Sequence, residues 1–425
     1  MNKPVIHWFR NDLRLHDNPA FLHSLESGQP VVPVFVIDDL WYQNQTSLGF
    51  PRAGKFRKQF LAESLLELKK ELEDRGSPLY VFKGDAVEIL SRLHHEIKAD
   101  GIVTQREYTH EEINQEEQLA QKLPLSRVWG SILFPPDMVD FPTEKSPFYY
   151  TKFKNKVIAQ PFSPSPVEKP EKIPSVPNLP FENEQTFFDP TQWEQMVGQY
   201  PFHGGESSGL KAFQKYIDQK GPFFYNQTRD YLNWENAGSG LSPWLANGNL
   251  SPRLLYDKLS RLNDEHPQHA ENIQPFLEQL IWRDYFRYLF LRYGIKLFTV
   301  QGLRKTQPDM YNDHQAFQLW LEGKTGEPII DALMRQLKNT GFISNRGRML
   351  VAFYLAKEMK VNWQWGAAWF ESMLVDYDVC SNYGNWGYQS GRGTDSRVNR
   401  RFNLKKQTEK FDPEGRLRER WLKAF

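Results

Sequence analysis

Cysteine and metal-binding patterns are scarce in this sequence. Cys380 is the single cysteine among 425 residues, which excludes an internal disulfide and a zinc site built from thiolates. The ten histidines lack the His-Glu-x-x-His spacing of a metal site, and none follows His314. We therefore expect a reducing compartment and no metal. Beyond His314, chemistry would rely on aromatic, Arg, Asp and Asn side chains instead of imidazole.

Long apolar runs are missing as well. No stretch approaches eighteen apolar residues, and the N-terminus, MNKPVIHWFRNDLRL, has no basic segment followed by a long apolar one. These absences argue against a transmembrane span and a secretory signal, and they predict a soluble, cytoplasmic protein without a membrane partner. With 40% hydrophobic and 14% aromatic residues, the chain can form two or three domains with cores of their own.

An excess of charge is absent from the chain as a whole but present in one part of it. The sequence has 53 Lys and Arg against 52 Asp and Glu, a net charge of +1. Residues 281–425 hold 24 basic and 15 acidic side chains, net +9, which leaves −8 for residues 1–280. Seven of the thirteen tryptophans lie in the same basic third. A nucleic-acid partner, which the total charge argues against, is therefore expected for the C-terminal third.

Hydrophobic patterning divides the chain into three regions. Residues 1–135 alternate short β-rich runs with helical patterns, which predicts an α/β domain with a parallel sheet. Neither a G-x-G-x-x-G motif nor a Walker loop accompanies it. The predicted strands are Val5–Phe9, Val31–Ile37, Leu79–Phe82, Ile102–Thr104 and Val128–Phe134.

The other two regions are a connector and a helical domain. Residues 136–200 are proline-rich and predict an interdomain connector that wraps the domain surfaces. Residues 201–425 show helical patterns, which predict an all-α domain able to enclose a large ligand. The connector contains aromatic side chains that need packing partners: Phe148, Tyr149, Tyr150, Phe153 and Trp193.

A Gly-Ser loop precedes one of the predicted helices. In GSGLSP, residues 238–243, Ser242 fits an N-cap and Pro243 the first helical position. Backbone N–H groups and the helix dipole would then face the loop, a suitable place for a phosphate. An ordinary capped helix after a turn gives the same pattern.

A polar and aromatic stripe marks the helix FLEQLIWRDYFRYLF. Gln279, Trp282, Arg283 and Phe286 share one face, because they are spaced by three and four residues. Such a stripe could line a cavity for a flat, polar ligand. The alternative is a salt bridge of Arg283 at the edge of a core helix.

Two charged segments could add to the same cavity. In SNRGR, Arg346 and Arg348 lie on different faces, so one can meet a buried carboxylate and the other a phosphate. Asp376 and Asp378 follow an apolar, aromatic helix, where carboxylates need cations or ligand donors. A structural Arg-Asp network between helices would explain the same residues.

A third charged segment lies near the C-terminal end. RVNRRFNLKKQ, residues 397–407, interleaves basic side chains with Phe402 and fits a surface that follows a phosphate backbone. A solvated charged face is the alternative.

Five segments, in this order, resemble the photolyase/cryptochrome flavoprotein family over almost the whole chain. They are WFRNDLRLHDNPA, LSPWLANGNLSPR, LIWRDYFR, GKTGEPIIDALMRQLKNTGFISNRGRM and LVDYDVCSNYGNWGY. SNRGR, DVCSNYGNW and the ending RFNLKKQ…FDPEG look most like the DASH branch of that family. The resemblance implies an α/β antenna domain followed by a helical domain that holds a U-shaped FAD.

The resemblance also assigns cofactor contacts. Asn382 would lie beside flavin N5, Asp378 would bond the polar edge of the ring, and Arg348 would pair with Asp376. Gly238 stands where the common pattern has Thr, so one hydroxyl contact to the FAD phosphates would be lost. The FAD-binding positions implied are Tyr225, Gly238, Ser239, Gly240, Leu241, Ser242, Arg283, Asn345, Arg348, Asp376, Asp378 and Asn382.

The implied activity is light-driven repair of cyclobutane pyrimidine dimers, preferentially in single-stranded DNA, by electron transfer from excited reduced FAD. Gln279 stands where dimer photolyases carry a Glu, and an amide cannot supply that proton at neutral pH. An alternative is therefore a DASH-like photoreceptor that binds DNA with little or no repair, and a third reading is a helical nucleic-acid binder without flavin. The implied contacts to the lesion are Trp282, Met349 and Tyr388. The implied contacts to DNA phosphates are Arg229, Arg346 and Arg400.

Two accessory functions complete the expectation. Trp386 and Trp363 match the first two members of the family's photoreduction relay, whereas Met310 replaces the third, so Tyr311 would substitute or the relay would be shorter. A folate antenna, 5,10-methenyltetrahydrofolate, would use an acid in REYTHEE, for which Glu107 is the nearest match. We expect a monomer.

Overall fold

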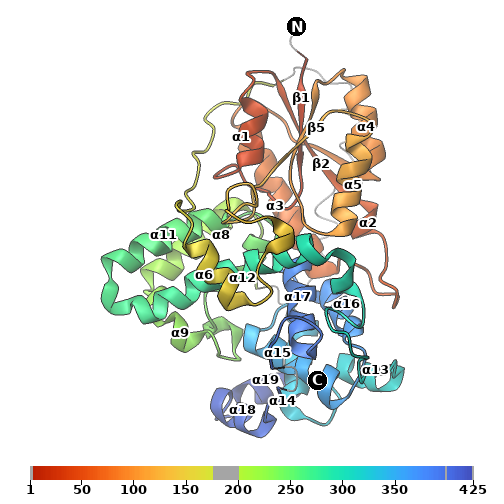
Figure 1. The fold of residues 1–425 in the computed structure, drawn as a ribbon, viewed down its shortest axis with the longest axis vertical. Helices are drawn as coiled ribbons and strands as arrows, with labels where there is room; N and C mark the ends of the chain where they lie inside the picture. The colour runs from red at the N-terminus through yellow and green to blue at the C-terminus, as the bar shows by residue number, and fades with distance from the viewer. Residues whose placement is uncertain (1–2, 176–200, 398–399, 424–425) are drawn as a thin grey trace.

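The computed structural model describes residues 3–175, 201–397 and 400–423, arranged as an α/β domain above a helical domain (Figure 1). Trp193 of the predicted connector lies outside the described residues. None of the described helices combines the length and the apolar character that a membrane crossing requires.

The N-terminal domain contains a five-stranded parallel sheet, as the sequence predicts. Its strand order is β3-β2-β1-β4-β5. The central strands β1 and β2 are buried along their whole length, which explains their nearly continuous apolar sequence. The strands are β1 (Val5–Phe9), β2 (Val31–Asp38), β3 (Tyr80–Gly84), β4 (Gly101–Gln105) and β5 (Leu125–Val128).

Helices cover both faces of this sheet (Figure 1). The apolar side chains of α4 (Ala86–Glu96) and α5 (His110–Ala120) pack on one face. Those of α1 (Pro19–Leu25) and α3 (Lys55–Glu73) pack on the other. The short α2 (Asp39–Tyr42) follows β2. This two-sided cover is the expected arrangement for a parallel sheet.

The prediction of a strand at Val128–Phe134 is wrong. The strand β5 ends at Val128, and the chain then turns into the core of the helical domain. The backbone N–H groups of Leu133 and Phe134 donate to the Asp284 carboxylate at 2.8 and 2.9 Å. The carboxylate of Asp284, about 150 residues away in the sequence, therefore accepts the backbone N–H groups that a neighbouring strand would have paired in a sheet.

The described part of the connector contacts both domains. Val167 and Ile173 donate their backbone N–H groups to Asp17 and Arg75 of the α/β domain, and the preceding stretch packs against the helical domain. It contains the 3-10 turn η1 (Thr143–Lys145) and α6 (Tyr150–Ile158). Phe153 and Val157 of α6 are fully buried in the same apolar core as the side chains of α12 (Ala270–Tyr293). Its aromatic residues therefore supply the packing surface that holds it in place.

The described residues from 201 onward are mainly helical, as predicted. The central helix α12 is buried without a break from Asp284 to Phe290 and lies among the other helices. The other α-helices are α8 (Glu206–Asp218), α9 (Tyr225–Thr228), α10 (Ser242–Ala246), α11 (Pro252–Glu265), α13 (His314–Glu322), α14 (Pro328–Thr340), α15 (Asn345–Phe353), α16 (Trp363–Met373), α17 (Val379–Ser390), α18 (Leu404–Phe411) and α19 (Arg416–Lys423). Short turns join them: η3 (Gly221–Phe224), η4 (Trp234–Asn236), η5 (Pro267–His269), η6 (Gly294–Phe298) and the π-helical η7 (Tyr354–Glu358).

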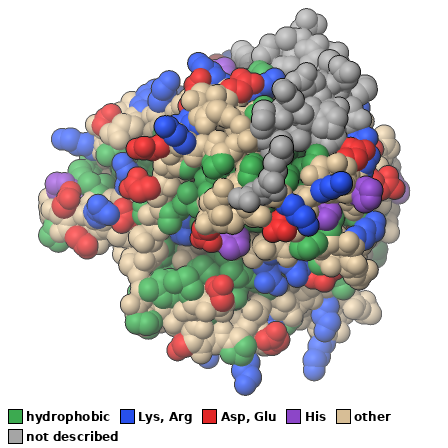
Figure 2. Space-filling model, turned by 90° about the horizontal axis from the view of Figure 1, so that it is seen from above, with side chains coloured by type: hydrophobic (Ala, Val, Ile, Leu, Met, Phe, Trp, Pro, Cys, Tyr) green, Lys and Arg blue, Asp and Glu red, His purple; other side chains and the backbone are tan. Residues whose placement is uncertain are grey.

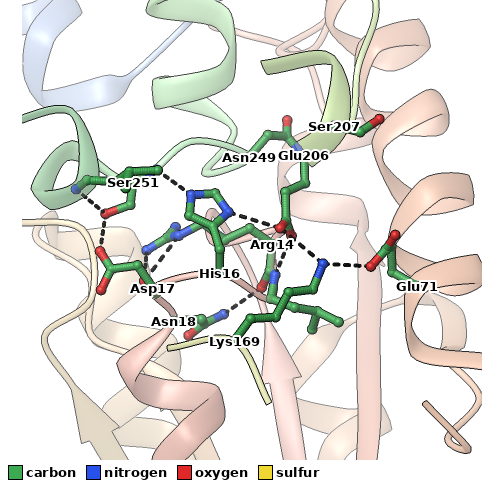
Figure 3. A network of polar contacts seen from close by, with 12 residues as sticks. Arg14, His16, Asp17, Asn18, Glu71, Lys169, Glu206, Ser207, Asn249 and Ser251 are labelled. Atoms are coloured by element: carbon green, nitrogen blue, oxygen red, sulfur yellow. Dashed lines mark hydrogen bonds and ion pairs between the residues drawn. The ribbon is translucent and has the colours of Figure 1, made fainter. Parts of the chain in front are cut away.

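A buried polar network joins the two domains (Figure 3). Asp17, from the loop before α1, accepts hydrogen bonds from Ser251 at the start of α11 and from Arg253 within that helix. Glu206, at the start of α8, accepts from the Leu15 backbone N–H at 2.6 Å and lies 3.1 Å from His16. Each charge in this network faces a partner, which is the condition for burying it.

The face seen from above the α/β domain carries a mixed surface. In Figure 2, basic and acidic side chains are interspersed over the visible described residues. The net negative charge of residues 1–280 is therefore not gathered into one patch on this face.

Candidate cofactor and substrate site

The helical domain encloses a cavity of about 470 Å³. Its wall is formed by α9, the loop before α10 and α10 itself, one face of α12, α15, and α17 with the residues before it, together with Phe370 of α16 and Arg400. Nearly all of the cofactor and substrate positions expected from the sequence line it. They are Tyr225, Arg229, Gly238, Ser239, Gly240, Leu241, Ser242, Gln279, Trp282, Arg283, Asn345, Arg348, Met349, Asp376, Asp378, Asn382, Trp386, Tyr388 and Arg400.

Three expected residues lie elsewhere. Arg346 forms an ion pair with Asp230 at 2.6 Å and is absent from the cavity wall. Trp363 is fully buried in the neighbouring apolar core. Glu107 lies in the N-terminal domain, at a second cavity.

The loop before α10 differs in one detail from its prediction. Leu241, and not Ser242, occupies the N-cap position, so Ser242 is the first helical residue. The Leu241 N–H donates to Ser239 Oγ at 3.4 Å. Ser242 does not cap the helix and instead lines the cavity. Gly238 and Gly240 have φ of +61° and +66°, a conformation that Thr adopts poorly, which explains glycine at position 238.

Arg283 gives the cavity wall a positive charge. Its guanidinium donates to two backbone carbonyls, Leu245 O at 3.2 Å and Ser131 O, and no carboxylate is among its described hydrogen-bond partners. Burial, and to a smaller extent repulsion by the Arg287 charge, lowers the pKa of Arg283 to about 10. The guanidinium therefore stays protonated at neutral pH. The described contacts of Arg283 therefore include no salt bridge, which argues against the alternative of an ion pair at the edge of a core helix.

The expected pairing of Arg348 with Asp376 is present. Arg348 Nη2 donates to both carboxylate oxygens, at 3.0 and 2.8 Å, and Arg348 Nε donates to the Ile343 carbonyl at 3.0 Å. The Asp376 side chain is almost completely buried. The pair joins α15 to the segment before α17 and fixes one side of the cavity.

Asp378 has a partner that the sequence interpretation missed. Its Oδ2 accepts from Arg287 Nη2 at 2.9 Å and its Oδ1 caps α17 through the Ser381 N–H at 2.7 Å. Burial alone would raise the pKa of Asp378, but the charges of Arg287 and Arg283 and the Ser381 bonds lower it to about 2. The signal in the sequence was the spacing of Arg287, four residues after Arg283 on α12.

Asn382 is buried and oriented by the protein. Its Nδ2 donates to the Ala367 carbonyl of α16 at 3.1 Å. Its position, one turn after Asp378, follows from the start of α17 at Val379. A carboxylate at this position could not make the same hydrogen bond.

Trp282, Tyr388 and Met349 lie at the same cavity, although they come from three helices. The edge of Tyr388 meets the Trp282 indole, with ring centres 5.9 Å apart at 88°. Met349 Sδ lies 3.9 Å from Asn345 Nδ2. Gln279 occupies the cavity-facing side of α12 one turn before Trp282. Flat and polar groups therefore share this part of the wall.

The tryptophans of the expected relay have separate surroundings. Trp386 is buried and lines the cavity, with Phe370 and Trp320 as ring neighbours at 5.1 and 6.1 Å. Trp363 donates its indole N–H to the Val300 carbonyl at 3.0 Å. Tyr311 is 62% exposed, and its hydroxyl donates to Asp309 at 3.2 Å.

The second cavity, of about 110 Å³, lies at the carboxyl ends of β1 and β4. Glu107 accepts from Asn11 Nδ2 and Gln105 Nε2, both at 3.2 Å. Burial, with the nearby Glu112 charge, raises the pKa of Glu107 to about 8. Arg283 and Asp378 line both cavities, so one wall separates them.

Comparison with known proteins agrees with this arrangement. Residues 276–425 match the sequence model described as the FAD binding domain of DNA photolyase, and residues 5–172 match that described as DNA photolyase. The chain is 37% identical to a cryptochrome DASH of Synechocystis, over 98% of this chain and 87% of the relative. It is 36% identical to a chloroplastic/mitochondrial cryptochrome DASH of Arabidopsis thaliana, over 99% and 76%.

Solved structures give the same result for the fold. The crystal structure of the cryptochrome from Synechocystis sp. PCC6803 superposes with a TM-score of 0.93 at 36% identity, over 99% of this chain and 89% of the other. An archaeal photolyase from Sulfolobus tokodaii, described as holding two FAD molecules, gives 0.83 at 32% identity, over 98% and 90%.

Proposed function

Because the chain belongs to the photolyase/cryptochrome family, we propose that it is a blue-light-dependent DASH-type photolyase that splits cyclobutane pyrimidine dimers, preferentially in single-stranded DNA, and acts as a monomer. One observation carries the proposal: a single cavity is lined by both the expected FAD contacts and the expected lesion contacts. A donor held beside its acceptor is what short-range electron transfer requires.

The residues at the cavity fit FAD. Arg283 offers a protonated guanidinium whose described hydrogen bonds go to carbonyls, so its charge would also be available to pair with a diphosphate. The Gly238–Ser242 loop would approach the phosphates closely, since a Cβ on Gly240 would meet no atom within 4 Å. Arg348, Asp378 and Asn382 would contact the flavin ring. When bound and reduced, the cofactor supplies light-driven donation of one electron and accepts it back.

The remaining residues hold the substrate. A pyrimidine dimer leaves the base stack at a cost of a few kcal/mol, less where the strand is already single. Trp282, Met349 and Tyr388 would contact its two pyrimidine rings, and the Gln279 amide would hydrogen-bond the lesion without supplying a proton. Arg229 and Arg400, also at the cavity, would neutralise flanking phosphates, and Arg346 would do so if DNA displaced Asp230.

Two accessory assignments belong to the same proposal. Trp386, Trp363 and Tyr311 would carry electrons to the cofactor from the surface, where Asp309 can take the Tyr311 proton. A folate antenna would use Glu107, which lies at the carboxyl edge of the sheet, the usual ligand side of such a sheet. The antenna assignment is tested by denaturing protein that was purified with its own cofactors and measuring the folate released. A preparation that releases no folate would contradict the assignment.

A second candidate function is a photoreceptor that binds DNA with little or no repair, which Gln279 favours. Wild type and Gln279→Glu, both loaded with reduced FAD, are illuminated with dimer-containing oligonucleotides, single- and double-stranded. The photolyase proposal predicts repair by the wild type, faster on single strands, and a further gain with Glu. Dimers left intact by the wild type but split by Gln279→Glu would favour the photoreceptor.

A further inference from the structure

The connector helix α6 covers the back of the turn of α12 that carries Trp282. Tyr150 is the first residue of α6, and its ring stacks on the Trp282 indole with ring centres 3.7 Å apart and planes at 13°. Trp282 also lines the large cavity. One aromatic face of Trp282 is therefore occupied by the connector while the rest of the side chain borders the cavity.

Polar contacts hold Tyr150 to the same turn of α12. The Tyr150 hydroxyl donates to the Glu278 carbonyl at 2.8 Å, the carbonyl that in an α-helix also accepts the N–H of Trp282. Lys154, one turn along α6, pairs with the Glu278 carboxylate at 2.8 Å. Burial and the Glu278 charge raise the pKa of Tyr150, so the hydroxyl stays a donor at every pH of use.

The other ring contacts of Trp282 leave it less constrained. Tyr285 and Tyr388 meet it edge-on at 5.4 and 5.9 Å, and Phe286 lies tilted at 5.5 Å. A parallel ring in van der Waals contact over the whole face restrains the plane of the indole most directly, and Tyr150 is the one described ring neighbour in that geometry.

We propose that Tyr150 is a positioning residue for the lesion. It holds the plane of Trp282 so that a flipped pyrimidine dimer stacks on an indole already in its bound orientation. This inference rests on the proposed function and extends the substrate site to the connector between the domains. Without the Tyr150 ring, Trp282 gains rotamer freedom that substrate binding must remove, which weakens dimer binding about fivefold.

The test measures binding in the dark with FAD-loaded protein. The probe is a fluorescent oligothymidine with one cyclobutane dimer, compared with the undamaged oligonucleotide by anisotropy. Tyr150→Leu should weaken binding of the damaged strand about fivefold and leave the undamaged strand unchanged, while Tyr150→Phe, which keeps the ring, should stay within twofold of wild type. The matched control is Tyr149→Leu, since Tyr149 is 42% exposed and its described ring contact is with Phe148.

A double-mutant cycle with Trp282→Ala distinguishes the positioning role of Tyr150 from the lesion contact assigned to Trp282. If Tyr150 acts through Trp282, adding Tyr150→Leu to Trp282→Ala has no further effect on dimer binding. An equal loss in both backgrounds, or no loss in Tyr150→Leu alone, overturns the positioning role. Unchanged dimer binding by Trp282→Ala alone overturns the lesion assignment of the proposed function itself.

Repair kinetics provide a second readout. Tyr150→Leu should raise KM for the damaged strand with kcat unchanged, because the residue does not contact the reacting bonds. A fall in kcat alone would contradict the proposal. If the Leu variant does not fold, Tyr150→Met serves the same test, since its side chain fills the space without a flat ring.

Discussion

Arg287, which is buried, and Asp378, whose side chain is 14% exposed, form an ion pair 2.9 Å long that joins the central helix α12 to the start of α17. The pair lies at the wall between the two cavities, and Asp378 lines both. Asp378 also caps α17, so the same carboxylate fixes the helix that presents Asn382 and Trp386. The cofactor site thus depends on a cation that the motifs alone did not identify.

Removing that cation should be costly. Arg287→Met leaves the largely buried Asp378 carboxylate without its main partner, and we expect a loss of about 3 kcal/mol in the free energy of unfolding, the lower end for a buried pair because Asp378 also borders the cavities. Urea unfolding of the apo-protein measures the loss. The matched control is Arg261→Met, which breaks an exposed pair with Asp257 and should cost less than about 1 kcal/mol. Equal losses in the two variants would contradict the importance given to the buried pair.

The interdomain network predicts a specific acid sensitivity. Burial favours the neutral form of Glu206, but His16, the Leu15 N–H and Lys169 outweigh it and lower its pKa from 4.5 to about 2. A lowered carboxylate pKa contributes stability above pH 4.5, and this contribution is lost as the pH falls toward 2. The shift corresponds to about 3 kcal/mol.

Glu206→Gln tests this contribution. The stability difference between wild type and variant should be largest above pH 5 and should shrink steadily between pH 4.5 and 2. Unfolding free energies at several pH values measure it, with Glu26→Gln, at an exposed pair with His23, as the control. A difference that does not change with pH would show that Glu206 does not act as a carboxylate in this network.

Asn382→Asp should change the redox properties of the bound cofactor. A negative charge in the cavity disfavours the addition of electrons to the flavin, so its midpoint potential should fall. The lost hydrogen bond to the Ala367 carbonyl adds a stability cost of about 1–3 kcal/mol. Asn339→Asp, on α14 and absent from the cavity wall, is the control. An unchanged potential would argue against placing Asn382 beside the flavin.

Arg400→Ala should weaken DNA binding about equally for all sequences. Loss of one phosphate contact lowers the slope of log K against log salt by about one. Arg416→Ala is the control, because this exposed arginine pairs with Glu414 outside the cavity wall. A loss confined to particular sequences would instead indicate a base contact for Arg400.

The sequence predicted most of what local pattern can encode. The pairing of Arg348 with Asp376, which the family resemblance implied, is present in the structure, whereas the residues by themselves required only that a carboxylate in apolar surroundings meet a cation. The strand at Val128–Phe134 was wrong because its donors bind Asp284, about 150 residues away. The cap at Ser242 was wrong because Leu241 takes that position.

Contacts between distant segments could not be predicted in the same way. Tyr150 and Trp282 are 132 positions apart, and neither periodicity nor spacing relates a proline-rich connector to a core helix. The sequence showed only that the connector is rich in aromatic residues. Such residues need packing partners, but the sequence does not identify them. The partner became visible only when α6 was seen against α12.

The most direct test of the central claim counts repaired lesions per flavin. Protein loaded with FAD, chemically reduced and kept without oxygen, is mixed with excess oligothymidine that carries one cyclobutane dimer, and the thymines restored are separated by chromatography after blue light or darkness. The proposed function predicts several repaired dimers per bound flavin under light and none in the dark. A bound, fully reduced flavin that restores no thymine under light would contradict it.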